Sequence, residues 1–206
     1  MDSKTEKAAN GTKLPYRIAV WAPVRETEEI PPLGPALEEH LIRISNPVAK
    51  HASCSAWQLL YRVLYRCGLQ AGTVCFEPGG KPYFAEGGIH FSITHSGGLC
   101  AVTAADVPTG VDVERVRADY RPALVQRVLS AAERAGFDGA FARLWCRKEC
   151  IAKLTGRGVG SHPAKIDTLD PQYTFLEHAT LYDGAEYRLA AAFLGAAGPA
   201  EWVRYE

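Results

Sequence analysis

Three charged residues, Lys148, Glu149 and Lys153, lie in a segment whose apolar residues recur at helical spacing. At about 100° per residue, Lys148 falls inside the apolar arc that contains Leu144 and Ile151. Burying an unpaired ammonium group is very unfavourable, so Lys148 needs an anionic partner or ligand. Glu149 and Lys153 are four residues apart and are therefore neighbours. On its own, this spacing is typical of a surface ion pair that stabilises a helix by about 0.2–0.5 kcal/mol.

A second acidic motif lies upstream, where residues 109–114 read T-G-V-D-V-E and predict a turn followed by a strand. Side chains alternate along a strand, so Asp112 and Glu114 point to the same side. Neighbouring carboxylates repel each other unless a cation lies between them, and Mg²⁺ prefers carboxylate oxygens. The motif is therefore either a hard-cation site or the solvated face of an edge strand. Glu149 could supply a third carboxylate, and Lys153 a phosphate contact.

Five motifs together resemble the 4′-phosphopantetheinyl transferase superfamily, and most closely the long, pseudo-dimeric type that activates peptide and polyketide synthetases. In chain order they are G-K-P-Y (80–83), F-S-I-T-H-S-G (91–97), G-V-D-V-E (110–114), L-S-A-A-E (129–133) and W-C-R-K-E-C-I-A-K (145–153). The chain departs from the family at Cys146, where Ser or Thr is usual, and at Thr94, where Ser is common. The first 75 residues match only loosely.

The mixture of helices and hairpins, without regular β-α-β alternation, predicts an α+β fold. The resemblance implies two similar subdomains related by a pseudo-twofold axis, each with helices packed on a small, mostly antiparallel sheet. We expect a disordered tail over residues 1–14, an N-terminal subdomain over 15–106, and a C-terminal subdomain over 107–206 that carries the metal and catalytic motifs. Coenzyme A would lie in the cleft between them. Since one chain holds both halves, a monomer is expected.

The resemblance also implies a reaction. The 4′-phosphopantetheine arm of coenzyme A would move to a serine of an apo acyl or peptidyl carrier protein, with release of adenosine 3′,5′-bisphosphate. Mg²⁺, or alternatively Mn²⁺, would bind Asp112, Glu114 and Glu149. Glu149 and Lys153 would be the catalytic residues, as base and as phosphate contact. The implied coenzyme A contacts are Lys81, Pro82, Thr94, His95, Ser96, Asp112 and Lys153.

Two assignments stay open at this point. Ser130 followed by Glu133 fits a capping box, so Glu133 is either a helix cap or a catalytic residue. In the family, basic residues near the first long helix hold the 3′-phosphate of coenzyme A. Lys50, His51 and Arg43 are candidates for that contact, but no motif fixes which of them is used.

Two rival functions are less consistent with the sequence. Some metal nucleases use acidic residues with E-x-K, whereas here Glu149 and Lys153 are four apart and the net charge is zero. A protein that binds coenzyme A or a carrier without catalysis is the other rival. The presence of Asp112, Glu149 and Lys153 argues against it, and an activity assay separates the two.

Composition limits the remaining classes. The 206 residues are 47% hydrophobic, enough for a real core, and 23 basic residues balance 23 acidic ones. That balance argues against nucleic-acid binding through bulk charge. The six cysteines lack C-x-x-C or similar metal-ligand spacing, and reduced thiols in a cytoplasmic protein explain them most simply. We find no apolar run of membrane length and no signal peptide, so no membrane contact is expected.

Local patterns predict the individual elements. An Asn46 cap and Pro47 predict the start of a helix that reaches Cys67. Glycine turns predict two hairpins, 89–94 with 99–106 and 173–182 with 187–194. The remaining predicted elements are strands at 16–21 and 73–77, a loop at 78–82, and helices at 36–44, 120–129 and 137–155.

Overall fold

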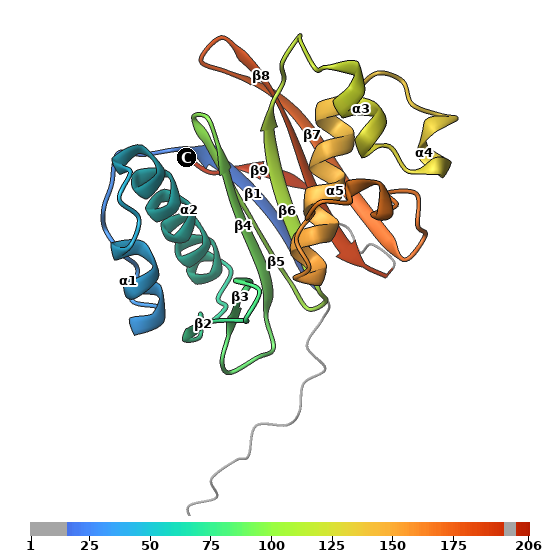
Figure 1. The fold of residues 1–206 in the computed structure, drawn as a ribbon. Coiled ribbons are helices and arrows are strands. Elements are labelled where there is room, and N and C mark those ends of the chain that lie inside the picture. The colour runs from blue at the N-terminus through green and yellow to red at the C-terminus, as the bar shows by residue number, and fades with distance from the viewer. Residues whose placement is uncertain (1–15, 196–200) are drawn as a thin grey trace, which may run out of the picture.

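The computed structural model describes residues 16–195 and 201–206. The expected tail, residues 1–14, lies outside the described residues. The first half of the chain runs from a strand through two helices to a hairpin (Figure 1). Its elements are β1 (Arg17–Pro23), α1 (Pro35–Ile42), α2 (Pro47–Arg66), β2 (Val74–Phe76), β3 (Pro82–Phe84), β4 (His90–Ser96) and β5 (Leu99–Ala105).

The second half repeats this order and confirms the α+β class. A strand is followed by helices and then by a hairpin, and a short last strand ends the chain. The elements are β6 (Thr109–Arg115), α3 (Pro122–Val128), α4 (Ala131–Arg134), α5 (Phe141–Thr155), a 3₁₀ turn η1 (Pro163–Lys165), β7 (Tyr173–Tyr182), β8 (Ala185–Leu194) and β9 (Trp202–Arg204).

The two main sheets have related strand orders, β4-β5-β1-β9 and β6-β8-β7, and β2 pairs with β3 separately. In each half, the first strand runs antiparallel to the second strand of the hairpin, so that β1 pairs with β5 and β6 pairs with β8. β9 comes from the end of the chain but pairs in parallel with β1. The pseudo-twofold axis and the boundary between residues 106 and 107 stay predictions.

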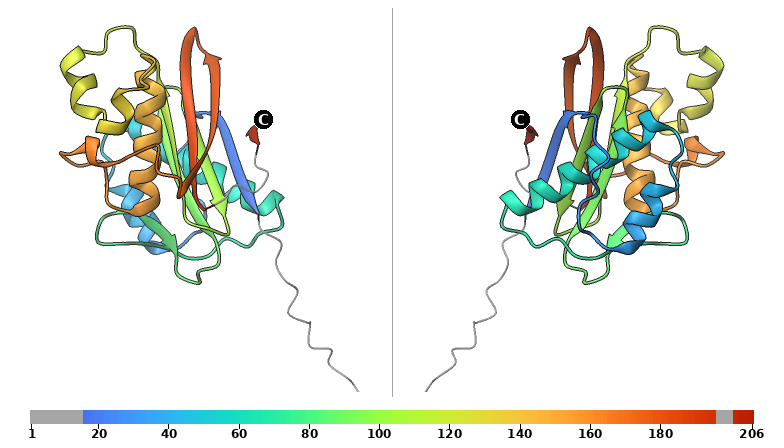
Figure 2. Two further views of the ribbon diagram at one scale, coloured as in Figure 1. Left: turned by 90° about the vertical axis from the view of Figure 1, so that its right-hand side faces the viewer. Right: turned by 90° about the vertical axis from the view of Figure 1, so that its left-hand side faces the viewer.

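Two groups of helices lie on opposite sides of the strands. α2 packs on β4 and β5, and α5 packs on β6 and β8. Figure 1 shows α1 and α2 on one side of the strands and α3 to α5 on the other. In Figure 2, α3 to α5 face the viewer in the left view, and α1 and α2 face the viewer in the right view. None of the helices within residues 16–195 and 201–206 is long and apolar enough to cross a membrane.

The predicted start of α2 is confirmed. The Asn46 side chain accepts a hydrogen bond from Ala49 N at 3.0 Å, and Pro47 occupies the first turn. Both features suit a helix N-terminus, where the backbone N–H groups have no helical partner.

The apolar spacing of this helix also predicts a buried stripe of Trp57, Leu60, Tyr61, Leu64 and Tyr65. Trp57, Leu60 and Leu64 are fully buried and belong to the largest apolar cluster of the described residues, together with strand residues of the first sheet. Tyr61 is partly buried against that cluster, but Tyr65 is exposed, so the prediction is wrong for Tyr65.

α5 starts four residues later than predicted, at Phe141 rather than Phe137. Gly139 has a φ of 87°, which a right-handed helix does not accommodate. At the other end, the helix stops as expected at Gly156, which adopts the left-handed conformation with a φ of 70°. Four short elements lie outside the predicted ranges: α4, η1, β9, and β3, which begins at Pro82 where a loop was expected.

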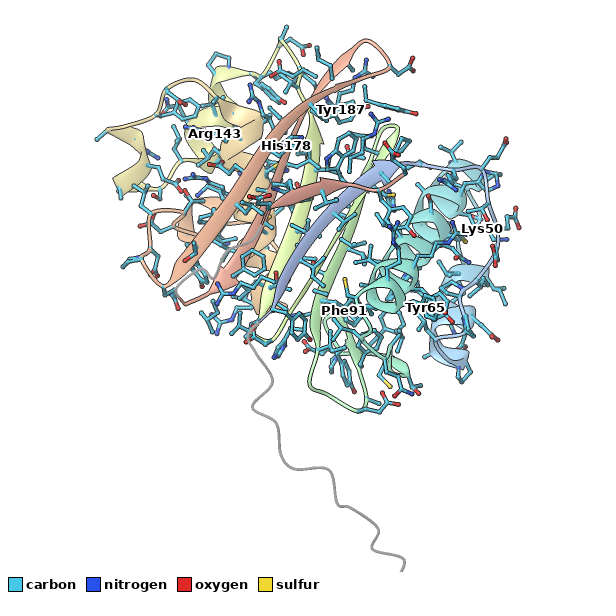
Figure 3. The ribbon with its side chains drawn as sticks, turned by 180° about the vertical axis from the view of Figure 1, so that it is seen from behind. Lys50, Tyr65, Phe91, Arg143, His178 and Tyr187 are labelled. Carbon is cyan, nitrogen blue, oxygen red and sulfur yellow. The ribbon has the colours of Figure 1, made fainter. Side chains whose placement is uncertain are left out.

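The two halves also meet at the turn of the first hairpin. The Gly98 N–H donates a hydrogen bond to the Tyr187 hydroxyl of β8 at 3.3 Å. A Cβ atom at Gly97 would lie 2.5 Å from that hydroxyl, so a larger residue would collide with it. Tyr187 is labelled in Figure 3, which views the molecule from behind. The glycines of this turn therefore allow the hairpin to pack against the second half.

Candidate functional site

The candidate site begins where β4 and β6 lie next to each other. These are edge strands of two different sheets. Side chains connect them: Ser92 Oγ accepts a hydrogen bond from Val111 N at 3.1 Å, and Thr94 Oγ1 donates one to Asp112 Oδ1 at 3.1 Å. Asp112, one of the predicted metal ligands, is thereby held at the boundary between the two halves.

α5 approaches β6 unusually closely. A Cβ atom at Gly110 would lie 2.0 Å from the Cys150 carbonyl oxygen and 2.8 Å from Leu154 N, so only glycine fits there. This contact brings the α5 backbone against the strand that carries Asp112. As a result, the Lys153 side chain reaches across to β6.

Lys153 is bound to β6 and β4 rather than to its helical neighbour. Its Nζ donates to Asp112 Oδ1 at 2.8 Å, to Thr94 Oγ1 at 3.0 Å and to Val111 O at 3.0 Å. Among the described residues, no ion pair joins Lys153 to Glu149. The spacing correctly predicted two neighbouring side chains on α5, but the carboxylate that pairs with Lys153 comes from the strand.

The charges of this cluster shift one another's pKa values. Burial alone would lower the pKa of Lys153, but the charge and hydrogen bond of Asp112 raise it above its ordinary value. Burial and the charge of Asp112 raise the pKa of Glu149. The pKa of Glu114 rises to about 7, because of burial and because Asp112 and Glu149 are nearby. The three predicted metal ligands therefore lie within electrostatic reach of one another.

The carboxylates suit a hard cation chemically. Asp112 Oδ2 is buried and has no hydrogen-bond donor, although Oδ1 has two. An orphaned carboxylate oxygen beside two further carboxylates with raised pKa values is an environment that a cation would stabilise. Among the described residues, however, no group of three or more His, Cys, Asp or Glu side chains is arranged as a metal site. The metal-ligand roles of Asp112, Glu114 and Glu149 stay predictions.

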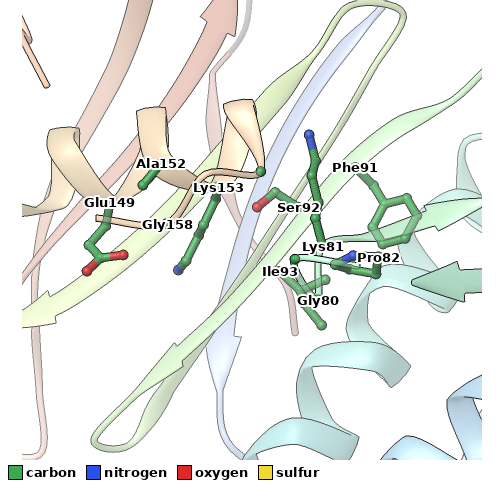
Figure 4. A pocket seen from close by; sticks show the side chains of 12 residues that line it. Gly80, Lys81, Pro82, Phe91, Ser92, Ile93, Glu149, Ala152, Lys153 and Gly158 are labelled. Atoms are coloured by element: carbon green, nitrogen blue, oxygen red, sulfur yellow. The ribbon is translucent and has the colours of Figure 1, made fainter. Parts of the chain in front are cut away.

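A cavity of about 260 Å³ opens beside this cluster. In Figure 4, Glu149 and Lys153 project from α5 on one side, and Lys81 and Pro82 lie on the other, near Phe91. The cavity thus combines residues of both halves. Its full lining is Gly79, Gly80, Lys81, Pro82, Phe91, Ser92, Ile93, Glu149, Ala152, Lys153, Gly156 and Gly158.

Lys81 connects the loop before β3 to the end of α5. Its Nζ donates to the Leu154 carbonyl at 2.5 Å, one of the carbonyls that a helix end leaves without a partner. Partial burial lowers the pKa of Lys81. A Cβ atom at Gly79 would lie 3.0 Å from the Gly156 carbonyl, so this loop also passes close to the α5 terminus.

Three other predicted coenzyme A contacts, Thr94, His95 and Ser96, lie further along β4, and Asp112 lies on β6. Thr94 is buried, whereas part of the His95 surface is exposed. The burial of the remaining part and the charge of Lys153 lower the pKa of His95. Of the predicted contacts, only Lys81, Pro82 and Lys153 are among the described residues that line the cavity. The ligand roles of Thr94, His95 and Ser96 stay predictions.

Glu133 forms the predicted capping box and also pairs with Lys148. Ser130 and Glu133 exchange both hydrogen bonds of the box. Glu133 Oε2 lies 2.7 Å from Lys148 Nζ, and its Oε1 accepts from the Thr168 N–H and hydroxyl at 2.9 and 2.7 Å. Lys148, fully buried, also donates to the Pro163 and Ile166 carbonyls. Lys148 therefore has the anionic partner that its position required, and the structure supports the cap interpretation of Glu133.

Residues 108–202 match the family model of the 4′-phosphopantetheinyl transferase superfamily. The second half of the chain is therefore similar to this superfamily. It is similar to the 4′-phosphopantetheinyl transferase psf-1 of Bacillus pumilus, with 32% identity over 92 residues, which are 40% of this chain and 39% of the relative. A putative 4′-phosphopantetheinyl transferase of Haemophilus influenzae is 31% identical over 91 residues, 39% of each chain. The chain thus spans about two fifths of the length of these relatives.

The superfamily match covers the second half of the site. It includes Asp112, Glu114, Glu149 and Lys153, all on β6 and α5. The first half contributes Lys81, Pro82 and the β4 residues, which lie outside the matched segment. The structure places Lys81 and Pro82 in the same cavity as Glu149 and Lys153, although the superfamily match does not include them.

The basic residues near α2 face carboxylates of their own chain. Lys50 Nζ lies 2.7 Å from Glu28, and His51 Nε2 lies 3.5 Å from the same side chain. Arg43 pairs with Glu39 at 2.5 Å. A superfamily 3′-phosphate contact through Lys50 or His51 would require that Glu28 be displaced.

Some lining residues were not singled out from the sequence. Ser92 lies two residues before Thr94, so strand alternation places both hydroxyls on the same side of β4, which faces β6. This alternation is the sequence signal by which Ser92 could be found. Gly156 and Gly158 directly follow the helix predicted at 137–155, and such a pattern indicates only the end of a helix. Their place in the cavity depends on the close contact between the two halves, which no local pattern reveals.

Proposed function

We propose that this chain transfers the 4′-phosphopantetheine arm of coenzyme A to a serine of an apo acyl or peptidyl carrier protein. The observation that carries the proposal is the shared cavity, where Lys81 from the first half meets Glu149 and Lys153 of α5. Two ammonium groups and a carboxylate around one cavity suit a substrate that is anionic and must also lose a proton.

The reaction is a phosphoryl-type displacement. The serine oxygen attacks the pyrophosphate phosphorus nearer the pantetheine and forms a new P–O bond. The bond from that phosphorus to the bridging oxygen breaks, and adenosine 3′,5′-bisphosphate leaves with the electron pair. Glu149 accepts the serine proton, directly or through a water molecule. Its raised pKa brings it closer to the operating pH, which favours a general base.

The cationic residues stabilise the charge that develops on the phosphates. Lys153 is held by Asp112 and lines the cavity, where it contacts the departing phosphate as a point charge. Lys81 and Pro82 hold the nucleotide end from the opposite wall, together with His95 and Ser96 along β4. Asp112, Glu114 and Glu149 would hold Mg²⁺, or Mn²⁺ in its place. The ion would neutralise the pyrophosphate charge.

A direct test combines the purified protein with coenzyme A, Mg²⁺ and several apo carrier proteins, and measures each carrier by mass spectrometry. The expected result is a gain of one phosphopantetheine group on at least one carrier, and no gain when its serine is changed to alanine. Coenzyme A that binds while no carrier gains mass would support a non-catalytic binding protein instead.

We also propose that the protein works as a monomer. One chain supplies both walls of the cavity, so a second copy is not needed to complete it. Sedimentation at working concentration is expected to give the mass of one chain. An obligate trimer would contradict this.

A further inference from the structure

We infer that Thr94 is a positioning residue, whose hydroxyl fixes Asp112 and Lys153 relative to each other across the boundary between the two sheets. The inference rests on the proposed function, in which Asp112 is a metal ligand and Lys153 a phosphate contact. It gives Thr94 a different role from the nucleotide contact that the family resemblance implies.

The hydroxyl occupies one corner of a closed triangle of hydrogen bonds. Thr94 Oγ1 donates to Asp112 Oδ1 at 3.1 Å and accepts from Lys153 Nζ at 3.0 Å. The third side is the Lys153 bond to the same carboxylate oxygen, at 2.8 Å. Both the proton and a lone pair of the hydroxyl are therefore used, which a methyl group in its place could not reproduce.

The surroundings leave the hydroxyl little other function. Thr94 is 7% exposed and Asp112 is 5% exposed, and neither is among the described residues that line the cavity. Within the described chain, no backbone ladder joins β4 to β6. Side-chain bonds such as those of Ser92 and Thr94 therefore define how β6 lies against the first sheet at this point.

The triangle also determines which carboxylate oxygen is free. Asp112 Oδ1 receives two donors, whereas Oδ2 receives none among the described residues. Without the Thr94 hydroxyl, the carboxylate loses one of the two bonds that set its rotation. Loss of such an outer contact to a metal ligand typically costs 10–100-fold in metal affinity or activity.

The test compares Thr94→Val and Thr94→Ser, with Thr109→Val as the matched control. Thr109 is buried on the same strand as Asp112, but its hydroxyl bonds to the Ala192 carbonyl at 2.9 Å and to the Thr103 hydroxyl at 3.2 Å. Its loss should lower the melting temperature without disturbing the triangle. Thr94→Ala serves as a second variant if Thr94→Val does not fold.

Binding of Mn²⁺ to the coenzyme A complex, measured by electron paramagnetic resonance, is the main readout because it needs no turnover. We expect Thr94→Val to weaken Mn²⁺ binding on the order of 10–100-fold, with the affinity for coenzyme A unchanged. Thr94→Ser should restore Mn²⁺ binding to near the wild-type value. Thr109→Val should bind Mn²⁺ as the wild type does.

Three results would overturn the inference. Thr94→Val could bind Mn²⁺ normally, Thr109→Val could weaken it equally, or Thr94→Val could lose coenzyme A affinity alone, which would favour a nucleotide contact. The proposed function is tested separately by carrier modification with the wild-type protein. If no carrier is modified but Thr94→Val still weakens Mn²⁺ binding, the proposed function fails and the positioning role stands.

Discussion

The long helices of the two halves occupy related places, but they bury different side chains. Each follows a strand and at least one shorter helix, and each precedes a hairpin whose second strand pairs with that first strand. α2 buries apolar residues together with the neutral polar Ser53, Ser55 and Gln58. α5 buries Lys148 completely and holds Lys153 partly buried against Asp112. Among the described residues, the charged residues that are buried as a whole, Asp112, Glu133 and Lys148, all lie in the second half.

The buried charges of the second half need partners of opposite charge, whereas the neutral polar residues that α2 buries do not. A buried ion pair costs desolvation energy and often stabilises a fold less than apolar residues of similar volume would. The Lys148–Glu133 pair is fully hydrogen-bonded and stabilises the segment around α5. The Lys153–Asp112 pair leaves one carboxylate oxygen without a donor. The Lys148–Glu133 pair therefore suits a structural role. The Lys153–Asp112 pair suits the binding of a cation, because one oxygen of Asp112 has no donor.

The largest effect on stability is expected from Lys148→Met. It leaves Glu133 buried and unpaired, which typically costs about 3–5 kcal/mol of unfolding free energy. Gln58→Met on α2 removes one neutral hydrogen bond, to the Glu29 carbonyl at 3.2 Å, and should cost about 1 kcal/mol. Urea unfolding of both variants measures the contrast. Equal losses would mean that the two interiors do not differ as described.

Arg147→Met is the control for that experiment. Arg147 precedes Lys148 on the same helix, but its pair with Glu177 is much more exposed. Such pairs contribute about 0–1 kcal/mol. A large loss here would show that any charge removed from α5 is destabilising, whether buried or not.

Gly110→Ala should destabilise the second half to a smaller extent. The added Cβ would lie 2.0 Å from the Cys150 carbonyl oxygen, so α5 must move away from β6. Overpacking of this kind costs typically about 1–3 kcal/mol. In Gly136→Ala, the added Cβ meets no atom within 4 Å, so that variant should keep its wild-type melting temperature or exceed it. A neutral Gly110→Ala would show that the close contact is dispensable.

The smallest expected effect is a pH dependence of the Glu133 contribution. Burial alone would raise the pKa of Glu133, but hydrogen bonds from Lys148, Ser130 and Thr168 lower it below its ordinary value of 4.5. The stability that this group contributes is therefore present above pH 4.5 and is lost as the pH falls through the lowered pKa. The difference in unfolding free energy between wild type and Glu133→Gln should shrink on acidification. A difference that is constant across this range would exclude the ionised pair as its source.

The sequence predicted what local spacing controls. The Ser130–Glu133 capping box follows from two residue types that are three positions apart. The Asn46 cap follows from an asparagine directly before a proline. The need of Lys148 for an anion followed from its position on the apolar arc. That Glu133 is this anion depends on how α4 packs against α5, and no spacing within one helix contains that information.

Contacts between elements that are distant in the sequence were beyond local patterns. Glu149 and Lys153 were expected to be neighbours, yet Lys153 pairs with Asp112, because Gly110 lets α5 approach β6 closely. The cavity exists because the loop around Lys81 meets the end of α5. β9, three residues long, gains its partner β1 from the opposite end of the described chain. Each of these depends on residues that are distant in the sequence.

In the proposed reaction, Glu149 accepts the serine proton in the cavity that both halves form. The most direct test is the rate of carrier-protein modification by Glu149→Gln over a Mg²⁺ titration, with Asp112→Asn as the comparison. Glu149→Gln should bind coenzyme A but lose on the order of 10²–10⁴ in turnover, which added Mg²⁺ does not restore. Asp112→Asn should recover part of its activity as Mg²⁺ rises. Near-normal turnover of Glu149→Gln at saturating Mg²⁺ would contradict the claim and leave Glu149 as a ligand only.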